Sequence, residues 1–170
     1  MINFTKMHGL GNDFVVMNNL DGDVCLSVEE IRQLSNRRFG IGFDQLLMID
    51  SATSKDADFR YVIFNADGTE VSQCGNGARC FALYIQKKNL SYKNPLTVET
   101  NAGLLVLNIN SDDTVKVDMG MPNFEPSKIP CLLYTSDAAD DSLRVDLGGR
   151  RIIKKHRLTY VSLSIPSHAH

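Results

Sequence analysis

Long hydrophobic runs are missing from this sequence. No apolar stretch approaches the roughly 20 residues that a helix needs to cross a bilayer, so we do not expect a membrane-spanning protein. The first residues, MINFTKMHGLGNDF, do not combine a charged segment with an apolar one in the manner of a secretory signal. We therefore expect a cytoplasmic protein rather than an exported one.

An excess of charge of one sign is missing as well. Lysine and arginine number 18 against 20 aspartate and glutamate residues, which leaves a formal net charge of −2. Proteins that bind nucleic acid or acidic membranes usually carry a positive excess, so this balance predicts neither kind of partner.

Cysteine is scarce, and its four copies do not form a recognisable framework. Cys25, Cys74, Cys80 and Cys131 show neither the density of a disulfide scaffold nor the paired Cys-x-x-Cys spacing of a zinc site. In a cytosol these residues are expected to be free thiols.

The length and the hydrophobic patterning predict one α+β domain. A chain of 170 residues can bury a sizeable core, and its 43% hydrophobic content is typical of a soluble globular protein. Strand patterns outnumber helix patterns and show no regular β-α-β alternation, which favours a largely antiparallel sheet. The predicted strands cover INFTKM, DFVVMN, QLLMID and FRYVIFN, followed by a β-meander from PLTVET to VKVDMG.

One helix is predicted in the segment SVEEIRQLSNRRFG. Ser27 can cap its start, and Glu30 completes a capping box. Ile31 and Leu34 mark the face that should be buried, and Gly40 is predicted to end the helix.

A second helix is predicted in FNADGTEVSQCGNGARCFALYIQ, directly after Cys74. Residues 79–86 are helix formers or apolar on nearly all sides, which is typical of a buried helix. Lys87 and Lys88 suit its last turn, and Asn89 can close it. We expect curved sheet to enclose this helix, with Cys74 at its amino-terminal end.

Cys74 is the candidate reactive group of this helix start. Amides of the first turn lack helical partners and can bind a carboxylate, while the helix dipole stabilises a thiolate. A thiolate beside an anchored α-carboxylate can remove the α-proton of an amino acid. The alternative is a buried structural cysteine, and we assign that role to Cys80, which lies about 240° further round the helix. Cys25 is given the same structural interpretation.

The sequence resembles the diaminopimelate epimerase family from Met1 to about Pro130. The matching segments are FTKMHGLGNDFVV, GIGFDQLLMID, FNADGTEVSQCGNGARCFA, VETNAGLL and VKVDMGMPNFEP, in family order. The resemblance implies inversion of one α-carbon of diaminopimelate by two cysteines, without pyridoxal phosphate or a metal. It also implies a curved, barrel-like sheet around a central helix, a small-molecule substrate, and no nucleic-acid or membrane partner. It allows a homodimer of the full-length enzyme.

The resemblance assigns one catalytic and five substrate-binding positions. Cys74 corresponds to one member of the cysteine pair, and the substrate-binding positions are Asn12, Gln45, Asn65, Gly75 and Asn76. Structural alternatives exist for three of them: Asn12 can stabilise a glycine turn, Asn65 can cap the turn after it, and Gln45 can be a strand-edge amide. His8 receives no role, and Arg79 has no identifiable partner.

The chain departs from the family after its first half. Only the first of two pseudo-symmetric domains is expected, as an incomplete domain of residues 1–130. The second catalytic cysteine, in a Glu-Cys-x-Gly-Thr-Gly-like motif, is absent, and Cys131 has no such surroundings. We therefore expect an open sheet edge and no epimerisation by these 170 residues. A proline or hydroxyproline racemase-type isomerase and a catalytically dead carboxylate-binding fragment remain alternatives.

Residues 131–170 form a segment of different character. The stretch LLYTSDAADDSLRVDLGGRRIIKK resembles translated sequencing-adaptor DNA, and the whole segment is predicted to be a non-native or disordered tail. Its basic residues, between Arg144 and Arg157, lack the interleaved aromatics of a nucleic-acid site.

Overall fold

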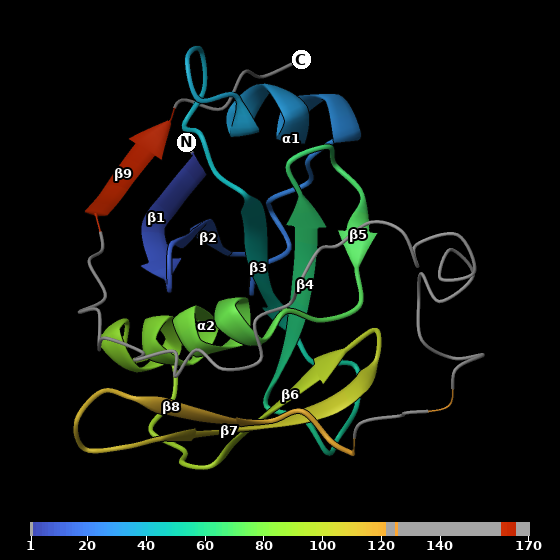
Figure 1. The fold of residues 1–170 in the computed structure, drawn as a ribbon, viewed down its shortest axis with the longest axis vertical. Helices are drawn as coiled ribbons and strands as arrows, with labels where there is room; N and C mark the ends of the chain where they lie inside the picture. The colour runs from blue at the N-terminus through green and yellow to red at the C-terminus, as the bar shows by residue number, and fades with distance from the viewer. Residues whose placement is uncertain (1, 122–124, 126–160, 166–170) are drawn as a thin grey trace, which may run out of the picture. The chain divides into compact units, whose positions relative to one another are not determined.

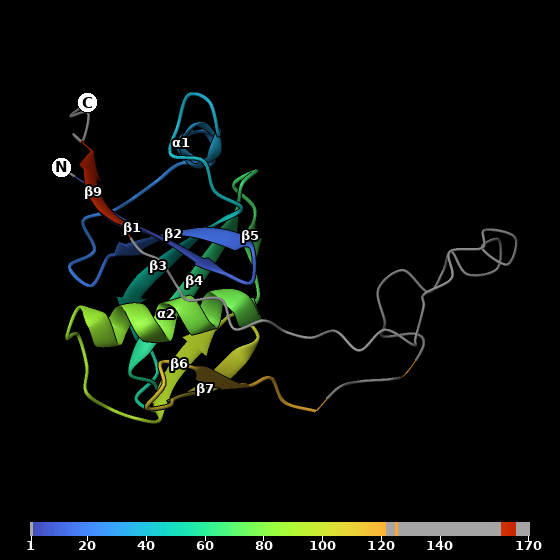
Figure 2. The same cartoon turned by 60° about the vertical axis from the view of Figure 1, so that its left-hand side comes forward.

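Helix α2 (Gly75–Lys87) runs between the two arms of one curled sheet, as Figures 1 and 2 show. The computed structural model describes residues 2–121, 125 and 161–165, the last five as a strand. All described helices and strands belong to one compact unit, which comprises Met1–Met119 and His156–His170. No helix in this described part is long and apolar enough to cross a membrane.

Within the described residues the sheet has nine strands, in the order β8-β7-β6-β4-β3-β2-β1-β9, with β5 paired to β4. Most neighbours are antiparallel, as predicted. The strands are β1 (Ile2–Gly9), β2 (Asn12–Asn18), β3 (Gln45–Ser51), β4 (Phe59–Asn65), β5 (Glu70–Val71), β6 (Leu96–Thr100), β7 (Gly103–Ile109), β8 (Val115–Asp118) and β9 (Val161–Ile165).

Two parallel pairs form β-α-β units within a sheet whose sequence showed no regular β-α-β alternation. Strand β2 pairs in parallel with β3, and β4 pairs in parallel with β6. Each pair is joined through one of the two helices, α1 (Val28–Ser35) or α2. Parallel neighbours need a connection that returns to the starting end of the sheet, and a helix supplies it. The two helices and the four strands of these pairs were predicted singly, and only their pairing revealed the two crossovers.

The sheet is covered on both faces in its central part, which explains the continuous apolar runs of β2 and β3. The inner face packs on α2 through a cluster that includes Phe14, Leu47, Tyr61 and Phe81. The outer face packs on α1 through Ile31, against Phe4, Val15, Met17, Leu46, Met48 and Val62.

The capping box predicted for α1 is confirmed. Ser27 Oγ accepts from the Glu30 amide at 3.2 Å, while the Glu30 carboxylate accepts from the Ser27 amide at 2.7 Å. Ile31 is buried and Leu34 packs against the same cluster. The predicted stop at Gly40 is wrong, because α1 ends at Ser35 with Asn36 as its cap. Gly40 is needed for another reason, since a Cβ there would lie 2.2 Å from the Gln33 carbonyl oxygen.

The edge of β1 is not open as expected, because β9 pairs with it antiparallel from Ile2↔Ile165 to Lys6↔Val161. Five residues of the predicted disordered tail therefore form a strand in the structure. Their alternation of apolar residues with Ser162 and Ser164 is a period-two strand pattern that the sequence reading missed. The adaptor-like stretch and Cys131 lie outside the described residues, so the non-native origin of the tail stays a prediction.

Candidate functional site

Cys74 occupies the N-cap of α2, where the sequence predicted it. Its backbone is extended (φ −145°, ψ 114°), and its Sγ accepts from the Gly77 amide at 3.4 Å. The first intrahelical bond runs from the Ala78 amide to the Cys74 carbonyl at 2.8 Å. The amides of Gly75 and Asn76 precede that bond and so have no acceptor within the helix. A half-buried sulfur thus lies beside two amide donors that an anion can use.

The side chain of Tyr61 is hydrogen-bonded to the backbone at the start of α2. Its hydroxyl donates to the Cys74 carbonyl at 3.3 Å, and its side chain is almost completely buried in the inner core. Burial, aided by the nearby Cys74 and Cys80, raises the pKa of Tyr61 well above its ordinary value. Tyr61 therefore remains a neutral donor that holds the N-cap backbone.

Gly77 makes this support possible. A Cβ on Gly77 would lie 2.2 Å from the Tyr61 hydroxyl and 3.2 Å from Leu47 Cδ2. Only a residue without a side chain lets the tyrosine reach the cap. The absence of a side chain at Gly77 thus allows a close approach of the helix to the protein's own core.

Gln45 and Asn65 come together across β3 and β4, where they are register partners. Gln45 Nε2 donates to Asn65 Oδ1 at 3.0 Å, and Asn65 Nδ2 donates to Thr69 Oγ1 at 3.2 Å. Within the described part of the chain, Gln45 Oε1 is buried and has no hydrogen-bond partner. A buried acceptor without a partner is costly, so this oxygen is suited to a donor supplied by a ligand.

Asn12 begins β2 at the end of the β1–β2 hairpin and pairs with Gly9. The turn between them places Leu10 and Gly11 at positive φ, 56° and 88°. Gly9 packs against the first turn of α2, because a Cβ there would lie 3.3 Å from the Asn76 carbonyl oxygen. The hairpin end that carries Asn12 therefore adjoins the helix start that carries Cys74.

Two contacts at the helix start were not predicted as such. Arg79 Nη1 donates to Asn76 Oδ1 at 3.1 Å, which supplies the partner that could not be chosen from sequence. The sulfur of Met119 lies 3.5 Å from the Cβ position of Gly75. Met119 remains 48% exposed, so this contact covers only part of its side chain.

The interpretation as a buried structural cysteine is confirmed for Cys80 and wrong for Cys25, which is exposed to solvent. Cys80 is completely buried, and this burial, with a contribution from Cys74, raises the pKa of its thiol to about 12. Cys25 is exposed in the loop before α1. Among the described residues, no group of histidine, cysteine and acidic side chains could hold a metal ion.

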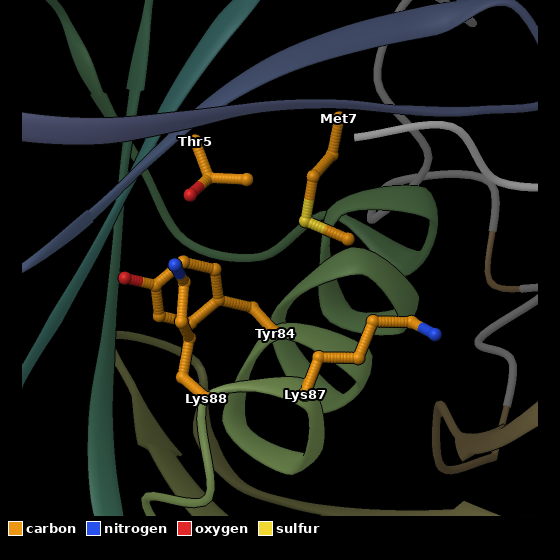
Figure 3. Close-up of a pocket in the computed structure, with 5 residues that line it drawn as sticks. All are labelled: Thr5, Met7, Tyr84, Lys87 and Lys88. Atoms are coloured by element: carbon orange, nitrogen blue, oxygen red, sulfur yellow. The ribbon is translucent and has the colours of Figure 1, made fainter. Parts of the chain in front are cut away.

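Two cavities among the described residues lie at the opposite end of α2 from Cys74. One, of about 50 Å³, is lined by Thr5, Met7, Tyr84, Lys87 and Lys88 (Figure 3). The other, of about 450 Å³, is lined by Ile2, Asn3, Asn18, Asn19, Asp21, Asp23, Val24, Tyr84, Lys88 and Leu90. Neither is lined by a predicted site residue.

Comparison with known proteins agrees with this arrangement. The chain is 51% identical over 156 residues to the diaminopimelate epimerase of Vesicomyosocius okutanii, a match that covers 92% of this chain and 58% of that protein. It is 46% identical over 165 residues to the diaminopimelate epimerase of Aromatoleum aromaticum, covering 97% of this chain and 57% of that protein. The chain therefore spans little more than half the length of these curated relatives.

A solved structure shares the fold at low sequence identity. The hydroxyproline epimerase from Agrobacterium vitis, with bound trans-4-hydroxy-L-proline, superposes with a TM-score of 0.53 at 16% identity, over 68% of this chain and 40% of that one. The family model of diaminopimelate epimerase matches residues 4–125, which include every predicted site residue. The chain belongs to the diaminopimelate epimerase family.

Proposed function

We propose that this chain is the first, one-cysteine half of an enzyme that interconverts LL- and meso-2,6-diaminopimelate in lysine and peptidoglycan precursor biosynthesis. The observation that carries the proposal is the position of Cys74 at the N-cap of α2, with the free first-turn amides beside its sulfur. Membership of the diaminopimelate epimerase family supports the choice of substrate.

The chemistry follows from this position. The amides of Gly75 and Asn76 bind the substrate α-carboxylate, and the Cys74 thiolate takes the α-proton from one face. The electron pair of the broken C–H bond remains on the α-carbon and delocalises into the carboxylate, where the amides and the helix dipole stabilise the charge. A second acid then delivers a proton to the opposite face. Because the reaction is reversible, the two groups exchange roles, and two thiols suit that exchange.

The polar side chains of the sheet bind the same end of the substrate in this proposal. The unpartnered Gln45 Oε1 accepts from the α-ammonium group, a donor that would relieve its buried, unpaired state. Asn65 orients Gln45 through their 3.0 Å hydrogen bond, and Asn12 approaches from the hairpin.

The 170 residues as written are proposed to lack epimerase activity, since their sequence contains no second cysteine in the family's motif. The test is incubation with LL-diaminopimelate in heavy water, with the α-proton followed by NMR. We expect no conversion to the meso isomer. Slow exchange with retention, abolished in Cys74→Ser, would show that Cys74 moves a proton on one face. Repeated turnover to the meso isomer by this chain would refute the need for a second cysteine.

A proline or hydroxyproline isomerase is the second candidate, and the fold shared with a hydroxyproline epimerase favours testing it. Binding separates the candidates. Titration of the labelled chain with LL-diaminopimelate, trans-4-hydroxy-L-proline and acetate should perturb the Gly75 and Asn76 amides most strongly with the first. Equal response to all three would favour a carboxylate-binding module without substrate preference.

A further inference from the structure

A cluster of four charged side chains lies beside two of the proposed substrate-binding residues. Asp13 directly follows Asn12 in the chain, and Asp44 directly precedes Gln45. The two carboxylates share Arg37, and Lys6 pairs with Asp13 at 2.9 Å and with the Gly42 carbonyl. The mechanism proposed above gives none of these charged groups a role.

The two aspartates bind each other's backbone reciprocally. The Asp13 amide donates to Asp44 Oδ2 at 3.0 Å, and the Asp44 amide donates to Asp13 Oδ1 at 3.1 Å. The Asp44 amide also lies 3.0 Å from the Asp13 carbonyl oxygen. These bonds brace the first residues of β2 against the residue that leads into β3, at the end of the sheet where Asn12 and Gln45 lie.

Arg37 holds the two carboxylates together. Its guanidinium donates to Asp13 through Nη1 at 3.0 Å and Nη2 at 2.8 Å, and Nη2 also donates to Asp44 Oδ1 at 2.7 Å. Two like charges at this separation repel each other, and a planar guanidinium can bridge both in a way that a lysine cannot. Burial opposes ionisation of Asp13, but its hydrogen bonds to Arg37 and Lys6 hold the pKa of this carboxyl well below its usual range.

The loop between α1 and β3 is shaped to deliver Arg37. Gly42 has a positive φ of 72°, and a Cβ there would lie 2.9 Å from Arg37 Cα. The loop can close on the carboxylates only with glycine at this position. The glycines of the segment RRFGIGFD thus serve the ion cluster as well as the chain reversal.

We infer that Asp13, Asp44 and Arg37 are positioning residues that set the spacing and orientation of Asn12 and Gln45 in the substrate site. This inference rests on the proposed function for the identity of the ligand. It does not depend on it for the geometry, since the bracing bonds are made without ligand.

The chain provides a matched control for a purely stabilising role. Asp58 accepts from the Thr97 amide at 2.9 Å and pairs with Lys93. Like Asp13, it therefore joins neighbouring segments through a backbone hydrogen bond and an ion pair. Asp58 immediately precedes β4, at the opposite end of that strand from Asn65, and contacts no proposed site residue among the described contacts. Asp58→Asn should therefore destabilise the fold without disturbing the site.

The experiment compares Asp13→Asn, Arg37→Lys and Asp58→Asn in the 170-residue chain by NMR. Relaxation of the ¹⁵N side-chain amides of Asn12 and Gln45 measures their order without ligand. Titration with LL-diaminopimelate then measures the dissociation constant. Arg37→Lys keeps the charge but loses the bridge, so it separates geometry from net charge.

We expect Asp13→Asn and Arg37→Lys to lower the order of both side-chain amides and to weaken binding on the order of tenfold, the value of one charge-assisted hydrogen bond. Asp58→Asn should leave both readouts unchanged at temperatures where all variants are folded. Unchanged amide order in the two cluster variants, or an equal loss in Asp58→Asn, would overturn the inference. A parent chain that does not bind diaminopimelate would contradict the proposed function, while the amide order would still decide the positioning role.

Discussion

Replacement of Gly77 by alanine tests whether the core under α2 determines where Cys74 lies. The added Cβ would stand 2.2 Å from the Tyr61 hydroxyl, far inside van der Waals contact, and 3.2 Å from Leu47 Cδ2. Tyr61 cannot withdraw, because it is 2% exposed and its ring lies 4.7 Å from the Phe81 ring. Either the helix start or the tyrosine must move, and either movement strains the hydrogen bond to Cys74.

The expected net loss of unfolding free energy is about 2 kcal/mol. A glycine-to-alanine change in a helix ordinarily stabilises by up to about 1 kcal/mol. Overpacking a filled core costs about 1–3 kcal/mol. Loss of the Tyr61 hydrogen bond adds about 0.5–1.5 kcal/mol. The overpacking and the lost hydrogen bond together outweigh the helix-propensity gain.

Urea unfolding followed by circular dichroism measures this change. With a slope of roughly 1–3 kcal/mol per M, the midpoint should fall by about 1 M. Tyr61→Phe removes the clashing oxygen, so Gly77→Ala should cost about 1–2 kcal/mol less in that background. Gly75→Ala is the control, because its Cβ would meet only the flexible Met119 side chain at 3.5 Å.

Two outcomes would refute the reasoning. A Gly77→Ala protein as stable as the parent would mean that the helix start is not held against Tyr61. A loss of equal size in the Tyr61→Phe background would mean that the hydroxyl is not the atom in conflict. In either case the core would not determine where Cys74 lies.

Three further predictions concern the N-cap of α1, the reactivity of the cysteine thiols and the loss of stability at acidic pH. Ser27→Ala should lower the unfolding free energy by about 1 kcal/mol, because the Glu30 amide loses Ser27 Oγ as its acceptor; urea unfolding measures it. Iodoacetamide should alkylate Cys74 in the native protein and spare Cys80, whose burial keeps it a thiol, as peptide mass mapping would reveal. Burial raises the pKa of Asp58, but the hydrogen bonds from Lys93 and the Thr97 amide lower it by more, so the net shift is downward. The ionised Asp58 carboxylate therefore stabilises the folded protein above its unfolded-state pKa of about 4, and this stabilisation is lost as the pH falls below that value. The melting temperature of Asp58→Asn should therefore fall less steeply with decreasing pH than that of the parent. An equally steep fall in both proteins would contradict this.

Local features of the sequence were sufficient for most elements. The capping box of α1, the apolar circumference of α2 and the two-residue alternation of the meander each depend on neighbours within one or two turns. The N-cap position of Cys74 was predictable for the same reason, since Gly-Asn-Gly followed by helix formers is a local signal. The alternating VSLSI segment is a local strand pattern of the same kind, although we did not predict a strand there.

The resemblance to known epimerases named the site residues, but only the tertiary structure shows which of them meet. Gln45 and Asn65 are register partners, Gly9 adjoins Asn76, and Arg37 bridges two aspartates from a loop. Pairings of this kind depend on sheet register and on how far a side chain reaches across space, and neither is encoded by spacing along the chain.

The sequence by itself thus determined the elements, the family and the cysteine, because helix caps, hydrophobic periods and motifs are local. Only the tertiary structure decided the two parallel crossovers, the β1–β9 pairing and the support of Cys74 by Tyr61. The physical reason is that these contacts join residues far apart in the chain, and their geometry exists only once the sheet has curled around α2.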